Sequence, residues 1–165
     1  MARTIDRFLP GAHETKTTTF PQPGRTSDAS GARAYLAYDA ATDEAAYWTT
    51  TVPLGFTGTM TLVVSYIMAS ATTNAVVWGA SVEAVTDGDA TDLDAGESLD
   101  TENTATDTVP GTAGYLGQAS ITLTTQDSAA AGDLMRIRIR RVGSSGSDTA
   151  TGDAYFLGAE LQDAA

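Results

Sequence analysis

Apolar and polar residues alternate along much of the chain with the period of a β-strand. In the stretch 59–68, Met60, Leu62, Val64 and Tyr66 share one side, while threonine, valine and serine occupy the other. Successive side chains of a strand point to opposite faces, so this pattern predicts a sheet with one buried face. Eight segments are predicted as strands: 34–38, 47–52, 59–68, 75–85, 100–109, 116–124, 134–142 and 154–161.

No segment shows a convincing helical pattern, and clusters of Gly, Pro, Asp, Asn and Ser separate the predicted strands. Antiparallel proteins with many short strands hide their edges by stacking or closing sheets. Tight hairpin signals such as Asn-Gly are scarce, which favours longer connections between two sheets, as in Greek keys. We therefore expect an all-β, antiparallel two-sheet sandwich, jelly-roll-like, with an extended N-terminal arm.

The arm is the polar stretch 1–31, which Pro10, Pro21 and Pro23 interrupt. Proline stops a helix and removes a backbone donor from a sheet ladder. The segment is expected either to be disordered or to order on a partner's surface, with 32–165 as the sandwich domain. The residues expected to anchor it are Arg3, Arg7, Phe8, Lys16, Phe20 and Arg25.

Charge is unevenly distributed along the chain. The net charge is −12, and the first 33 positions hold five basic and three acidic residues, so they carry +2 and the remainder −14. An acidic body disfavours nucleic acid and anionic membranes as partners. No apolar run reaches the ~20 residues of a membrane span, and the N-terminus lacks the apolar region of a signal peptide.

The residue inventory argues against most kinds of catalysis. The chain has no cysteine and one histidine, His13, which lies in the polar arm. Disulfides, thiolate nucleophiles and zinc sites with sulfur ligands are therefore excluded, and a serine triad would have to run through that one histidine. We expect no enzymatic activity and no cofactor.

An acidic segment follows the fourth predicted strand, with candidate calcium ligands at Asp87, Asp89, Asp92 and Asp94. Ca²⁺ takes six to eight oxygen ligands. An EF-hand counted from Asp87 would need glycine at its sixth position and glutamate at its twelfth, where this chain has Asp92 and Ser98. A solvated loop is the default interpretation, and the calcium site is the alternative. The same carboxylates, with Asp100 and Glu102, are the only material for a glycosidase.

Three arginines, Arg136, Arg138 and Arg140, fall on one face of the segment 134–142. In an acidic body they are expected to meet carboxylates, either from a neighbouring strand or from another subunit. They are our candidates for a subunit interface. Binding of phosphate or an anionic glycan is a weaker alternative, because a row of arginines alone is little evidence.

Trp48 and Trp78 are candidate stacking platforms for sugar rings. Trp78 shares its side of the segment 75–85 with Val76, Ala80 and Val82. That parity favours core packing over ligand stacking for Trp78.

Three stretches together resemble the small jelly-roll decoration (cement) and head-fibre proteins of tailed phages and related archaeal viruses. They are VPLGFTGTMTLVVSY at 52–66, NAVVWGASVE at 74–83, and MRIRIRR at 135–141 with DTATGDAYFLGAE at 148–160. The resemblance covers about residues 45–162 as a rhythm of motifs, and no single motif is diagnostic.

The resemblance implies a homotrimer that binds the major capsid protein on the outer surface of a virion and stabilises the shell. It implies synthesis in the host cytoplasm, and the N-terminal arm would reach across the capsid. The alternative from another class is a receptor- or carbohydrate-binding sandwich module of a viral fibre or tail.

Overall fold

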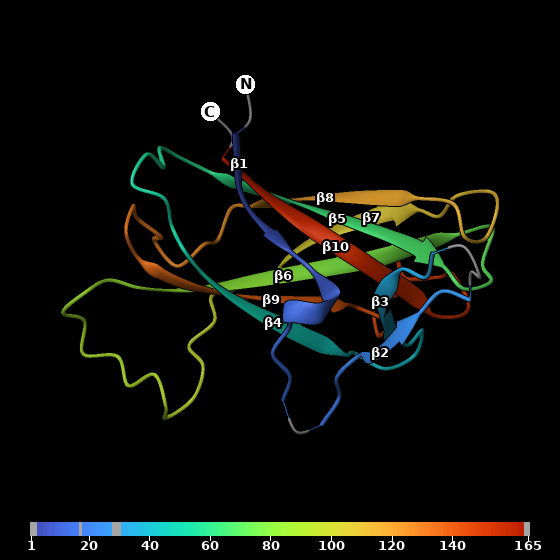
Figure 1. Cartoon of the computed structure of the whole chain (residues 1–165), viewed down its shortest axis with the longest axis horizontal. Helices are drawn as coiled ribbons and strands as arrows, with labels where there is room; N and C mark the ends of the chain where they lie inside the picture. Colours follow the sequence, from blue (N-terminus) through green and yellow to red (C-terminus); the bar gives the residue numbers. More distant parts are fainter. Residues whose placement is uncertain (1–2, 17, 28–30, 164–165) are drawn as a thin grey trace.

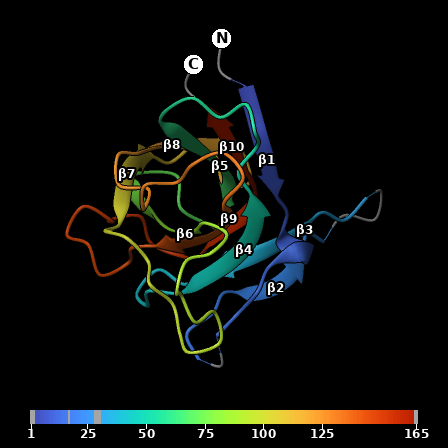
Figure 2. The ribbon, with the colours of Figure 1, turned by 90° about the vertical axis from the view of Figure 1, so that its left-hand side faces the viewer.

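The computed structural model describes residues 3–16, 18–27 and 31–163, which form two antiparallel β-sheets packed face to face (Figures 1 and 2). The six-stranded sheet contains β1 (Arg3–Phe8), β2 (Gln22–Arg25), β3 (Ala34–Tyr38), β5 (Met60–Met68), β8 (Gly117–Leu123) and β10 (Ala154–Asp163). The four-stranded sheet contains β4 (Ala45–Thr51), β6 (Ala75–Val85), β7 (Asn103–Thr108) and β9 (Leu134–Arg141). A short 3₁₀ turn, η1 (Pro10–Ala12), follows β1.

The strand order is that of a jelly roll. The six-stranded sheet runs β2-β3-β10-β5-β8, with β1 also paired to β10, and the other sheet runs β4-β9-β6-β7. From β3 to β10 every connection except β6–β7 passes from one sheet to the other, which produces the paired Greek keys of this fold. The predicted fold class is confirmed.

The eight predicted strands are β3 to β10, and their observed ends lie within three residues of the predicted ones. Alternation also identified the buried side correctly, since Met60, Leu62, Val64 and Tyr66 are fully buried between the sheets. On β6, Trp78 and its neighbours of the same parity lie in the core, as predicted.

The N-terminal segment differs from the expected separate arm. β1 pairs with the C-terminal half of β10, and β2 pairs with β3, so both strands belong to the six-stranded sheet. Phe8 lies in the core, with its ring 5.9 Å from that of Trp48. Pro23 is tolerated because β2 is an edge strand, where one side of the backbone has no neighbour.

In the part of the chain that the structure describes, no helix is long and apolar enough to cross a membrane.

Candidate binding surface

The candidate site lies on the outer face of the four-stranded sheet, where three rows of side chains cross β4, β9 and β6. Thr49, Arg136 and Glu83 stand in one row. The next row holds Tyr47, Arg138 and Ser81, and the third holds Ala45, Arg140 and Gly79. Alternation along β9 places the three arginines on this face, because Ile137 and Ile139 enter the core.

Glu102 joins two of the arginines. Its carboxylate accepts bonds from Nε and Nη2 of Arg140 at 2.5 and 2.7 Å, and Nη2 of Arg138 lies 3.4 Å away. A Cβ atom on Gly79 would come within 2.7 Å of this carboxyl group, so glycine at that position lets Glu102 lie against the sheet. The hydrogen bonds that Arg140 donates to Glu102 outweigh the effect of burial and raise the pKa of Arg140.

The remaining partners of the arginines also come from the same chain. Asp43 accepts from Nη1 of Arg140 at 2.8 Å, and Glu14 lies 3.5 Å from Nη2 of Arg136. From the sequence, carboxylates of this chain and carboxylates of another subunit were both possible partners of the three arginines. Within this chain each guanidinium already has one, so an intersubunit ion pair is not required to neutralise it.

Two segments cover part of this face. Glu14 forms a two-way backbone bridge with Tyr47 at the free edge of β4, with N···O distances of 2.8 and 3.0 Å. On the other side, the β6–β7 loop returns along β6, where Ser98 N donates to the Glu83 carboxylate at 2.7 Å. The loop is the long yellow-green segment that projects from the sandwich in Figure 1.

Lys16 and Glu97 connect these two segments by an ion pair. Lys16 follows Glu14, which bridges to Tyr47 of β4, and Glu97 precedes Ser98, which bonds to Glu83 of β6. Since β9 lies between β4 and β6, the ion pair crosses over β9. Hydrogen bonding to Glu97 raises the pKa of Lys16. We call this contact the strap. Lys16 Nζ lies 5.7 Å from the centre of the Tyr47 ring, which places the strap near the Tyr47 row.

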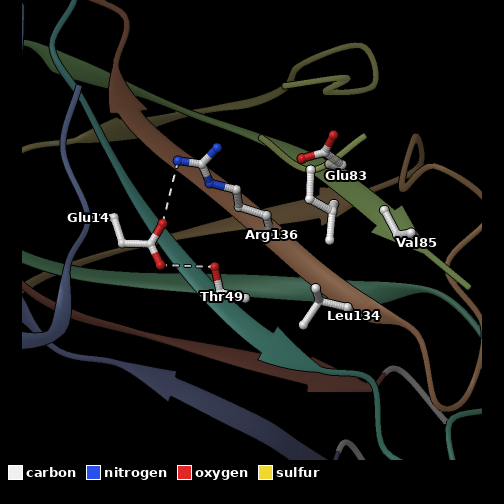
Figure 3. Close-up of a pocket in the computed structure, with 7 residues that line it drawn as sticks. Glu14, Thr49, Glu83, Val85, Leu134 and Arg136 are labelled. Atoms are coloured by element: carbon white, nitrogen blue, oxygen red, sulfur yellow. Dashed lines mark hydrogen bonds and ion pairs between the residues drawn. The ribbon is translucent and has the colours of Figure 1, made fainter. Parts of the chain in front are cut away.

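A cavity of about 280 Å³, which we call the main cavity, opens on the Thr49 row (Figure 3). Its polar side consists of Glu14, Thr49, Glu83 and Arg136. Glu14 connects two of these groups, since one carboxylate oxygen faces Arg136 and the other accepts from Thr49 Oγ1 at 3.0 Å. The apolar side consists of Val85, Leu93 and Leu134.

A smaller cavity, of about 170 Å³, lies along the other two rows. Lys16, Asp43, Tyr47, Arg138 and Arg140 contribute to its wall. Its lining is more strongly charged than that of the first cavity, and each of its arginines is already bonded to a carboxylate.

Two of the four candidate calcium ligands in the acidic loop accept hydrogen bonds within turns. Asp89 accepts from Thr86 N at 2.9 Å, and Asp92 accepts from Asp94 N at 3.3 Å, while Asp87 is exposed. Among the described residues, no group of three or more His, Cys, Asp or Glu side chains is placed to hold a metal ion. The calcium alternative therefore has no geometric support here.

The other carboxylates considered for glycosidase chemistry are also occupied by structural bonds. Asp100 accepts from Asp127 N at 2.9 Å and from Thr101 N at 2.6 Å, and these bonds lower its pKa. Glu102 is held by Arg138 and Arg140. The two side chains therefore serve the fold.

Both tryptophans are buried in the core, with 3% of Trp48 and none of Trp78 exposed. Trp78 contacts Tyr38 edge-on, with ring centroids 5.1 Å apart. Neither indole is available to a sugar ring, so the stacking role considered for Trp48 and Trp78 is wrong.

The anchoring candidates of the N-terminal segment occupy several different positions. Arg3 donates to Gly55 O at 2.8 Å and faces Asp163, while Arg7 lies 3.9 Å from Glu160. Phe8 is in the core, Lys16 forms the strap, Phe20 is half-buried and Arg25 is exposed on β2. Arg7, with 72% of its side chain exposed, and Arg25 both present their positive charge to solvent.

Of the residues that line the main cavity, only Arg136 was identified from the sequence as a candidate site residue. A signal existed for Glu83, because a carboxylate inside the otherwise apolar strand β6 is unusual. Glu14 and Leu93 carried no comparable signal, since each comes from a polar segment that only the fold brings to this face.

Comparison with known proteins gives a likeness of fold. No protein-family model matches the chain, and no curated protein matches it. A solved carbohydrate-binding module of Cellvibrio mixtus lichenase 5A, determined in complex with cellotriose, is similar with a TM-score of 0.52 and 10% identity. The similarity covers 99% of this chain and 100% of the module, and it supports the β-sandwich fold.

Proposed function

We propose that this chain is a non-catalytic binding domain whose main cavity holds the end of a glycan. The observation that carries the proposal is the division of the cavity into an apolar side, Val85, Leu93 and Leu134, and a polar side around Arg136 and Glu83. A sugar ring has apolar C–H faces and a rim of hydroxyl groups. The cavity offers a surface suited to each.

The polar groups match the hydrogen-bonding needs of a hydroxylated ligand. Carboxylates of Glu14 and Glu83 accept bonds, and the guanidinium of Arg136 donates them in a fixed planar geometry. Arg136 is positioned by the Tyr47 ring, whose centre lies 4.5 Å from the guanidinium carbon. Its Nε is buried without a hydrogen-bond partner, so one donor remains unused.

The size of the cavity limits the ligand. At about 280 Å³ it lies just below the usual range of ligand pockets, roughly 300–1,000 Å³. One or two sugar rings fit this volume. Jelly rolls serve as lectin domains, and the similar solved module was bound to cellotriose, which supports the class of ligand but not the identity of the sugar.

The test is a glycan array followed by titration calorimetry with any sugar that binds. We expect Arg136→Gln and Glu83→Gln to weaken binding at least tenfold, since each removes a charged hydrogen-bonding group worth about 1.5–3 kcal/mol. Arg25→Gln, an exposed arginine on the opposite sheet, is the matched control and should bind as the original chain does. A chain that binds no glycan, or equal binding by all variants, would refute the proposal. Release of reducing ends would refute its non-catalytic part.

Capsid decoration is the second candidate, proposed from the resemblance described above. The observation that favours it is the exposure of Arg7 and Arg25 on β1 and β2, two positive groups at the edge of an acidic body. They would contact the major capsid protein on the outer surface of a virion, and a homotrimer would multiply such contacts.

This candidate is tested by mixing the protein with undecorated capsids. Deleting the N-terminal segment is unsuitable, because it would remove Phe8 from the core and two strands from the sheet. The double variant Arg7→Glu/Arg25→Glu keeps the fold and should bind capsids less than the original chain. Binding unaffected by both changes would eliminate this role for the segment.

A further inference from the structure

Glu83 is a nearly buried carboxylate for which the chain supplies no positive partner. It lies on β6 and is 5% exposed, and its Oε1 accepts a hydrogen bond from Ser98 N at 2.7 Å. Within the residues that the structure describes, Oε2 accepts no hydrogen bond and neither oxygen forms an ion pair. Charged groups are rarely buried without a partner, because it is costly to remove a charge from water. The negative charge of Glu83 is therefore available to a ligand.

Arg136 is the basic residue next to Glu83, yet it neutralises a different carboxylate. The two residues stand opposite each other in the pairing of β6 with β9. The guanidinium extends towards Glu14, with 3.5 Å between Nη2 and the carboxylate, and it lies over the Tyr47 ring (Figure 3). The wall of the main cavity thus holds two carboxylates and one guanidinium. Its uncompensated charge is negative and belongs to Glu83.

A further cavity, of about 310 Å³, adjoins the main cavity at Glu83. We call it the acidic cavity, because its wall contains no lysine or arginine and three more carboxylates, those of Asp89, Asp127 and Asp133. Each of the three accepts a hydrogen bond from a backbone amide, at 2.7 to 2.9 Å, and is thereby fixed in place. Fixed charges of one sign around a cavity focus its electrostatic potential. A positive group is therefore attracted to Glu83, which both cavities share.

The wall suits an ammonium group better than a metal ion. Among the described residues, no three or more His, Cys, Asp or Glu side chains are placed together to hold a metal. An ammonium group has three N–H donors, so one carboxylate and neighbouring hydroxyl groups satisfy it. Glu83 provides the carboxylate, and hydroxyl groups in the two walls come from Thr49, Thr86 and Ser98.

Resting on the proposed function, we infer that the glycan is a hexosamine with a free amino group and that its ammonium binds Glu83. Val85 lies two residues after Glu83 on the same face of β6, and with Leu93 and Leu134 it forms the apolar side of the main cavity. A sugar ring packed against these side chains places its substituents beside Glu83. A sugar acid would meet a like charge there, and a neutral sugar would leave the charge of Glu83 uncompensated.

The experiment compares matched pairs of methyl glycosides by NMR titration of the full chain. In the gluco, galacto and manno series, the 2-amino sugar is compared with the parent sugar, whose hydroxyl group is similar in size to an ammonium group. We expect the amino sugar to bind at least tenfold more tightly in at least one series. The Ser98 amide signal should shift on binding, because Ser98 N donates to Glu83.

The charge of the amine has two direct readouts. N-acetylation, which removes the charge, should abolish the preference for the amino sugar. Raising NaCl from about 20 to about 500 mM should reduce the preference, since salt screens the attraction between the ammonium and the carboxylates.

Two variants assign the preference to Glu83. Glu83→Gln retains the length of the side chain and an acceptor for Ser98 N, and it should bring the amino sugar and its parent to similar affinities. Asp94→Asn removes one charge from an exposed residue that lines neither cavity, so it should retain the preference. Circular dichroism verifies that both variants fold.

The outcomes separate this inference from the proposed function. Equal affinity for amino and parent sugars, or a preference that persists in Glu83→Gln, would overturn the inference and leave glycan binding intact. Binding of no sugar in any series would overturn both. Ethanolamine, an amine without a ring, is the last comparison. If it binds as tightly as the amino sugar and shifts the same Ser98 signal, the ring is not held and the inference fails.

Discussion

Arg141 and Asp148 form an ion pair inside the protein, with Nη2 and Oδ1 2.7 Å apart and exposed fractions of 0% and 1% for the two side chains. Arg141 also donates to the carbonyls of Ala150 and Gly152, and Asp148 accepts from Val77 N. The pair fastens the β9–β10 connection to β6. Its charges are acceptable in the core because each is hydrogen-bonded on several sides.

Breaking this pair is predicted to be costly. Arg141→Met or Asp148→Asn should each lower the free energy of unfolding by about 3–5 kcal/mol, since each leaves a buried charge without its partner. The double variant should lose much less free energy of unfolding than the sum of the losses of the two single variants. Urea denaturation of the four proteins in a double-mutant cycle measures this, and additive losses would contradict it.

Phe8 tests whether the N-terminal segment is part of the fold. Phe8→Ala should destabilise the protein by about 3–5 kcal/mol, because it leaves a void beside Trp48. Arg7→Ala, at the exposed neighbouring position, should change stability by about 0.5 kcal/mol or less. Thermal denaturation compares them. Similar midpoints for both variants would mean that β1 is not docked in solution.

Trp48 is predicted to serve stability and not recognition. Trp48→Phe should cost about 1–2 kcal/mol, because the indole Nε1 loses its bond to Leu9 O at 3.0 Å and a smaller ring fills the space less well. Its effect should appear in the urea midpoint, while glycan affinity stays unchanged. Lost affinity with unchanged stability would reverse this assignment.

Protonation of Asp43 is predicted to lower the stability of the protein in acid. Burial alone would raise its pKa, but hydrogen bonds from Ser144 and the charge of Arg140 lower it below the ordinary value of 3.8. A lowered pKa contributes stability above pH 3.8, and that contribution is lost as the pH falls through the lower, folded value. Asp43→Asn should therefore be destabilised by about 1–2 kcal/mol at pH 7 and should approach the original chain as the pH falls below the lowered pKa of Asp43. A difference that stayed constant with pH would contradict this.

Glu44 provides the control of opposite sign. Burial raises its pKa above 4.5, so its contribution is favourable below that pH and is lost as the pH rises. Glu44→Gln should be slightly more stable than the original chain at pH 7 and should lose that advantage near pH 4. The same urea series detects both trends.

The fold was predictable because alternation is a local signal. β5 and β9 show it in every second residue, and the scarcity of tight hairpin turns indicated connections between sheets. β1 and β2 were missed for the opposite reason. They are short and mostly exposed, and β2 contains Pro23 and Gly24, so neither shows an apolar face of its own.

The site was less predictable than the fold because its parts come from distant segments. The row of arginines could be read from β9, but Glu14 and Glu102 reach them from positions more than 30 residues away. The choice between an intramolecular and an intersubunit partner depends on that placement. The two tryptophans show how far a local pattern reaches. The burial of Trp78 could be predicted from its parity on β6, whereas Trp48 lacked so clear a pattern.

The strap bears on the length of ligand that would fit if the main cavity holds a glycan as proposed. Lys16 lines the smaller cavity, and Glu97 precedes Ser98, which bonds to Glu83 of the main cavity, so the ion pair lies across β9 between these two groups. In the proposed complex a terminal sugar would enter beside the closed ion pair, whereas the interior of a long polymer lying along the sheet would have to displace it. Under that proposal, two side chains that do not line the main cavity would favour chain ends over chain interiors.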